Sequence, residues 1–91
     1  MAERGKRAGL RVALVEVIPW NNGHPRADRP IRRLNKLIRA AGVELGVPVF
    51  SWYRRLEDPA APGRMRRALT DDGDHPSVEG YRALARDVEL P

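Results

Sequence analysis

The longest apolar run of the chain extends from Leu10 to Ile18, and from residue 12 onward Glu16 is its one polar residue. A nearly continuous apolar run of this length is typical of a strand in a parallel sheet that is covered on both faces. Pro19 ends the run, and turn-forming residues follow as far as Pro25. We therefore predict a buried strand at 10–18 and a loop after it, although the pattern does not explain Glu16.

A second pattern, with the spacing of an amphipathic helix, follows this loop. Asp28 can cap the helix, Pro30 suits its first turn and Gly46 is a favourable residue just beyond its end. The apolar positions recur on one face. They are Ile31, Leu34, Leu37, Ile38, Ala41 and Leu45.

A shorter apolar segment, Val47–Trp52, predicts a second strand. The order strand, helix, strand predicts two parallel strands joined by a right-handed crossover. Residues 54–71 contain two prolines and one glycine and predict a loop with at most one helical turn. Ser77 then precedes a final helix. Its predicted apolar face consists of Val78, Tyr81, Leu84, Ala85 and Val88.

These elements predict an α/β fold that is incomplete as a domain. Two strands alone do not make a stable sheet, and a chain of 91 residues buries only a modest core. We expect residues 1–91 to be a single partial domain, the C-terminal part of a flavodoxin-like doubly wound parallel sheet with the order β-α-β-loop-α.

Composition narrows the classes of protein. The chain has no cysteine, no apolar run of membrane-spanning length and an N-terminus too polar for a signal peptide, so we expect a cytoplasmic protein that does not enter the membrane. The net charge is +5, and the first forty residues hold ten Lys or Arg against three Asp or Glu.

A basic first half raises nucleic-acid binding as one alternative function. The cations that would serve it are Arg32, Arg33, Lys36, Arg39, Arg64, Arg66 and Arg67. Because no aromatic residues interleave with these cations, and most fall on predicted solvent faces, we favour solvation of the surface over nucleic-acid binding.

The most specific segment for chemistry lies between Asp72 and Tyr81 and reads Asp-Gly-Asp-His-Pro-Ser-Val-Glu-Gly-Tyr. An Asp and a His three residues apart, followed by Pro-Ser and then Gly-Tyr before an amphipathic helix, resemble the last conserved block of the SGNH (GDSL-type) serine hydrolases. The order of the preceding elements is also similar to the closing part of that fold. The resemblance covers about residues 10–88.

The resemblance implies ester hydrolysis by a Ser-His-Asp triad, without metal or cofactor. His75 would be the general base and Asp72 the carboxylate that orients it. On spacing alone, Asp71 and Asp74 are rivals for the role of Asp72. The loop after the first strand suggests a rim for the substrate site. Its candidate residues are Trp20, Asn21, Asn22 and His24.

The nucleophile is the part of the triad that the sequence does not supply. In the family it lies in a Gly-Asp-Ser block after the first strand, and neither this block nor those carrying the other oxyanion donors is visible. The two serines are Ser51, in a predicted strand, and Ser77, a predicted helix cap.

Because no nucleophile is visible, we expect a truncated hydrolase with little or no turnover on its own. Its expected partners are an ester substrate in the intact family and a separate N-terminal hydrolase half. A non-enzymatic remnant that self-associates through an exposed sheet edge is the alternative.

Overall fold

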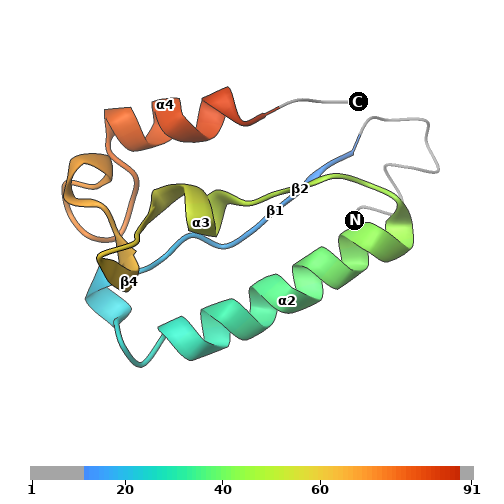
Figure 1. Ribbon diagram of the computed structural model, residues 1–91, viewed down its shortest axis with the longest axis horizontal. Coiled ribbons are helices and arrows are strands. Elements are labelled where there is room, and N and C mark those ends of the chain that lie inside the picture. The colour runs from blue at the N-terminus through green and yellow to red at the C-terminus, as the bar shows by residue number, and fades with distance from the viewer. Residues whose placement is uncertain (1–11, 89–91) are drawn as a thin grey trace.

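The computed structural model describes residues 12–88, so the first two residues of the predicted first strand lie outside the described part. Figure 1 shows α2 and α4 running along opposite sides of the strands β1 and β2, with α3 between the strands and α4. In chain order the elements are β1 (Leu14–Val15), a 3₁₀ turn (Asn21–Gly23), α2 (Asp28–Leu45), β2 (Val49–Phe50), α3 (Trp52–Leu56), β3 (Glu57–Asp58), β4 (Ala61–Met65), a 3₁₀ turn (Arg67–Leu69) and α4 (Val78–Arg86).

The strands β1 and β2 pair in parallel, with Leu14 opposite Val49. The backbone N–H of Leu14 donates to the carbonyl of Pro48 (2.9 Å), and that of Glu16 donates to Phe50 (3.2 Å). The β-α-β unit and the α/β class are therefore confirmed, although each regular strand is much shorter than the apolar run that predicted it.

The first strand is not covered on both faces, contrary to the prediction. Val15 and Val17 are 40% and 37% exposed, whereas Glu16 between them is 5% exposed. Glu16 is buried because its carboxylate pairs with the guanidinium of Arg39 on α2 (2.5 Å) and accepts the backbone N–H of Tyr53 (3.3 Å). Glu16, which the apolar pattern did not explain, thus makes polar contacts that connect the end of β1 to α2 and α3.

The start of α2 also differs from the prediction. The cap position is occupied by Ala27, which provides no side-chain cap, and Asp28 is the first helical residue. The carboxylate of Asp28 is engaged elsewhere, because it accepts the hydroxyl of Tyr53 and pairs with Arg32. The end of α2 follows the prediction, since Gly46 adopts the left-handed conformation with φ 66°.

The buried side of α2 includes only part of the predicted apolar stripe, in which Ile31, Ile38, Ala41 and Leu45 are half-buried. Leu34 and Leu37 are exposed, and the buried residues of the helix are Asn35 and Gly42. A methyl group added at Gly42 would lie 2.2 Å from Cγ2 of Val49. Helix and strand can therefore approach this closely only because residue 42 has no side chain.

Residues 54–71 form more regular structure than the predicted loop. After α3, the strands β3 and β4 make an irregular antiparallel hairpin in which Glu57 pairs with Met65. Pro62 and Gly63, which favoured a loop, lie within β4, and Gly63 has φ 87°. The hairpin accommodates them through its shift in register.

The hydrophobic core lies beneath this hairpin, where Leu56, Met65 and Leu84 are buried against one another. Ser77 caps α4, as predicted, by accepting the backbone N–H of Gly80 (3.2 Å). The predicted apolar face of α4 is covered only in part, because Val78 and Tyr81 are exposed. Within residues 12–88, no helix is long and apolar enough to span a membrane.

Gly42→Ala should destabilise the fold by about 1–3 kcal/mol, because the added methyl group overpacks the contact with Val49. This is opposite to the gain of about 1 kcal/mol expected for Gly→Ala in an open helix. Urea unfolding measures the difference. In a Val49→Ala background, the same substitution should cost less, and an equal cost in both backgrounds would show that the helix–strand contact is not the cause.

Candidate active site

The Asp-His segment forms a tight loop between the core and α4. Thr70 and Pro76 close the loop as an isolated antiparallel bridge. The hydroxyl of Thr70 donates to the carbonyl of His75 (2.7 Å) and accepts the backbone N–H of Gly73 (3.0 Å). Gly73 has φ 80°, a conformation that side chains disfavour. Hydrogen bonds within the loop therefore contribute to its conformation.

Asp72 and His75 contact each other on this loop. Oδ2 of Asp72 lies 3.0 Å from Nδ1 of His75, and Oδ1 of Asp72 accepts the backbone N–H groups of Asp74 and His75, both at 2.8 Å. The two side chains are 55% and 70% exposed. Within residues 12–88 the Nε2 atom of His75 has no hydrogen-bond partner, so it can contact a molecule that approaches from solvent.

These contacts shift the protonation of both groups. The side-chain hydrogen bond to Asp72, and then its negative charge, raise the pKa of His75 above its ordinary value. The same bond, with the backbone N–H groups of His75 and Asp74, holds the pKa of Asp72 well below its usual range. The ion pair therefore persists between the two pKa values; it is lost when pH falls through that of Asp72 or rises through that of His75.

The rival aspartates are placed differently. Asp71 is exposed, and the structure gives its carboxylate no contact with His75. Oδ1 of Asp74 instead accepts hydrogen bonds from Nε1 of Trp20 and Nδ2 of Asn22, both at 2.6 Å. Of the three candidates, Asp72 is therefore the one that the structure pairs with the imidazole.

The four predicted rim residues separate into two groups. Trp20 and Asn22 contact the Asp-His loop through Asp74, and the backbone N–H of Asn21 donates to the carbonyl of Gly73 (3.0 Å). The ring of His24 instead lies against Gly63, where an added methyl group would come within 2.9 Å of it.

A cavity of about 460 Å³ lies along the segment that follows β1, and residues within the range 20–27 supply its lining. Trp20, Asn22 and His24 contribute to its lining. The structure therefore gathers three of the predicted rim residues around one cavity, while Asn21 has its side chain turned to the backbone of Met65.

Neither serine is arranged as a nucleophile for His75. The hydroxyl of Ser77 donates to the carbonyl of Ala68 (3.0 Å) and accepts the N–H of Gly80, so it is occupied as a helix cap. Ser51 is exposed and immediately precedes α3, and the structure gives it no contact with His75.

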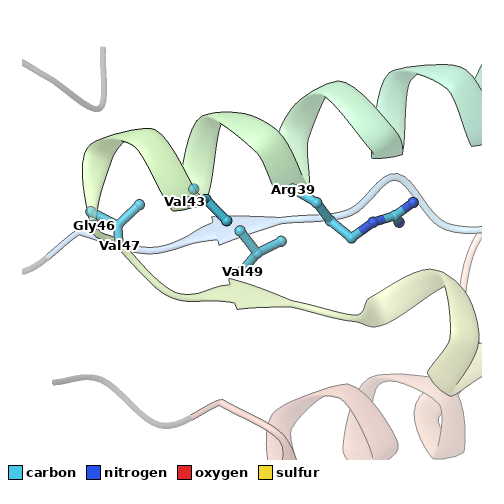
Figure 2. Close-up of a pocket in the computed structure, with 6 residues that line it drawn as sticks. Arg39, Val43, Gly46, Val47 and Val49 are labelled. Atoms are coloured by element: carbon cyan, nitrogen blue, oxygen red, sulfur yellow. The ribbon is translucent and has the colours of Figure 1, made fainter.

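A second cavity, of about 490 Å³, lies at the other end of α2 (Figure 2). Val43, Val47 and Val49 line it together with Arg39 and two glycines. Its lining contains no nucleophile or general base. Among residues 12–88, no group of three or more His, Asp or Glu side chains is placed to hold a metal ion.

Sequence reasoning did not identify Thr70 as a site residue, and it considered Asp74 only as a rival of Asp72. The hydroxyl of Thr70 binds the backbone of Gly73 and His75 within the loop, and Asp74 joins the loop to the segment after β1. The Thr-x-x-Gly spacing from Thr70 to Gly73, which overlaps the Asp-His pair, is a local signal that could have indicated the role of Thr70. The partners of Asp74 lie more than fifty positions away, and no local signal marks them.

An exposed imidazole oriented at Nδ1 by an aspartate, on a loop before the last helix of an α/β fold, has the arrangement of the acid–base part of a serine hydrolase.

No family model and no curated protein sequence matches the chain. Solved structures, in contrast, do match the chain. A GDSL-like lipase from Bacteroides thetaiotaomicron matches with a TM-score of 0.80 and 26% sequence identity, over 94% of this chain and 44% of that chain.

A proposed acylhydrolase from Bacteroides fragilis matches similarly, with a TM-score of 0.79 and 26% identity, over 93% of this chain and 43% of that chain. The chain is thus related to the SGNH (GDSL-like) hydrolases. It spans less than half the length of the solved structures that it matches.

Asp72→Asn should lower the pKa of His75, because a neutral amide no longer stabilises the imidazolium. Titration of the imidazole protons by NMR, with the spectrum of the folded chain as reference, measures the change. Asp71→Asn is the matched control and should leave the pKa of His75 as it is in the wild type. Equal values for wild type and Asp72→Asn would contradict the ion pair.

Proposed function

We propose that the chain supplies the acid–base part of a Ser-His-Asp triad for ester hydrolysis. The observation that carries this proposal is the contact between Asp72 Oδ2 and His75 Nδ1 at 3.0 Å, which leaves the other ring nitrogen free. The likeness to the GDSL-like lipase supports an ester as the class of substrate. No step of this chemistry needs a cofactor or a metal ion.

In the proposed reaction, Nε2 of His75 takes the proton of a serine hydroxyl as the oxygen attacks the ester carbonyl, and later returns it to the leaving alkoxide. Asp72 accepts the Nδ1–H, which fixes the tautomer whose Nε2 can act as a base. The imidazolium formed in the first step is stabilised by the same carboxylate, in line with the raised pKa of His75.

The nucleophile in this proposal belongs to a segment outside residues 12–88. That segment would extend the pair β1–β2 into a flavodoxin-like doubly wound sheet, of which residues 1–91 are a partial domain. The exposed Val15 and Val17 on β1 and its continuation, and the exposed Leu34 and Leu37 on α2, support this idea, because the longer relatives have chain to cover such surfaces.

The same exposed apolar surface also favours a second function, self-association without catalysis. A dimer by light scattering that persists in the His75→Ala variant would support it. Nucleic-acid binding is not favoured, because Arg32 and Arg39 of the basic set are paired with carboxylates.

Ester hydrolysis can be tested in a chimera in which residues 12–88 replace the matching segment of the Bacteroides thetaiotaomicron GDSL-like lipase. We expect the chimera to hydrolyse p-nitrophenyl acetate, and His75→Ala to reduce kcat by about 10³-fold or more, because the serine loses its base. Asp71→Asn is the control and should keep the activity of the chimera.

A chimera that melts cooperatively but hydrolyses the ester equally well with and without His75 would contradict the proposal. The isolated chain should form no adduct with a fluorophosphonate, as judged by intact mass. An adduct lost in Ser51→Ala or Ser77→Ala would mean that one of these serines is the nucleophile.

A further inference from the structure

Two segments that are 50 to 54 positions apart in sequence are joined by hydrogen bonds at the candidate active site. The first is the segment Trp20–Asn22, which follows β1, and the second is the loop 70–76. Nδ2 of Asn22 donates to the carbonyl of Asp72 (2.8 Å) and to Oδ1 of Asp74 (2.6 Å). Nε1 of Trp20 donates to the same oxygen of Asp74 (2.6 Å).

Asp74 is therefore the point at which the two segments meet. One of its carboxylate oxygens accepts two side-chain N–H groups at short distance. The hydrogen bonds from Asn22 and Trp20 lower the pKa of Asp74, so the carboxylate that accepts them stays ionised. Asp74 is adjacent to His75 in the chain, so these contacts lie one residue from the imidazole.

Gly73 adds steric contact to these hydrogen bonds. A methyl group at this position would lie 3.0 Å from Oδ1 of Asn22 and 3.1 Å from its Nδ2. The carbonyl of Gly73 also accepts the backbone N–H of Asn21 (3.0 Å). The side chain of Asn22 therefore packs directly on the turn between Asp72 and Asp74.

The segment after β1 is itself fixed to the core. Oδ1 of Asn21 accepts the backbone N–H of Met65 (2.6 Å), a residue that is 3% exposed and belongs to the hydrophobic core. The connection runs from the core through Asn21 and Asn22 to the exposed loop. An exposed loop is thereby attached to the hydrophobic core.

From this arrangement we infer that Asn22 and Asp74 are positioning residues, which hold the backbone of the loop 70–76 so that Asp72 and His75 stay in contact. The catalytic meaning of the inference rests on the proposed ester hydrolysis, but the positioning itself does not. Trp20 acts with them by fixing the carboxylate of Asp74.

The test compares Asp74→Ala with Asp74→Asn in the full 91-residue chain, with the pKa of His75 measured by NMR titration as the readout. Both substitutions remove the same negative charge near His75. Only Asn keeps an oxygen that accepts hydrogen bonds from Trp20 and Asn22. We expect the pKa of His75 to fall in both variants and to fall further in Asp74→Ala, because the contact with Asp72 loosens.

Asn22→Ala and Trp20→Phe remove donors without changing any charge, and each should also lower the pKa of His75. Trp20→Phe keeps an aromatic ring and so gives a second measurement if another variant does not fold. The inference is overturned if Asp74→Ala and Asp74→Asn give the same pKa, and the two donor variants give the wild-type value, in chains with wild-type circular dichroism.

This experiment and the chimera test fail independently. If the variants show no pKa differences but the chimera hydrolyses the ester in a His75-dependent way, the positioning role is wrong and the proposed function stands. If the variants show the pKa differences but the activity of the chimera does not depend on His75, the positioning role stands and the proposed function is wrong. No turnover is needed for the NMR measurement.

Discussion

The arrangement of the chain depends on how Asn35 of α2 binds the backbone after β1. Its side-chain oxygen accepts the N–H of Val17 (2.6 Å), and its amide donates to the carbonyl of the same residue (2.8 Å). Asn35 is 2% exposed, and removal of its amide would take away the side-chain partner of both backbone groups of Val17. This pair of bonds sets α2 against the strand and directs the segment that leads to Trp20 and Asn22.

Buried polar groups of this kind do much of what a larger hydrophobic core does elsewhere. Four hydrophobic side chains are buried within residues 12–88: Tyr53, Leu56, Met65 and Leu84. Between the helices and β1, the contacts are instead made by Asn35 and by Glu16 with Arg39. Polar contacts need specific geometry, so they define a single arrangement of the elements where apolar contacts are few.

The sequence predicts the features that arise from nearby residues. The β-α-β order, the left-handed Gly46 and the cap at Ser77 depend on periodicity and local conformation, and the structure has all three. The hairpin of β3 and β4 was not predicted, because its pairing depends on an irregular register and two residues that normally break strands. Asp28 was predicted as a cap because its partner Tyr53, 25 positions away, leaves no trace in the local pattern.

The same division applies to the candidate site. The Asp72–His75 contact spans three positions, so a local motif was enough to indicate it, although the choice of Asp72 over Asp71 and Asp74 came from the family resemblance and not from spacing; the structure has this contact. The contacts of Asp74 with Trp20 and Asn22 span more than fifty positions and become visible only in the fold. A local motif can therefore indicate which groups pair on one loop, while the contacts between distant segments require the fold to be known.

The exposure of the pair explains why it needs more than its own geometry to act in catalysis. At 70% exposure of the imidazole, water screens the attraction between His75 and Asp72. Electrostatic stabilisation of a developing imidazolium is stronger where water is excluded. In the proposed hydrolase, the segment that brings the serine would also cover this surface, so one packing event would supply the nucleophile and strengthen the pair that activates it.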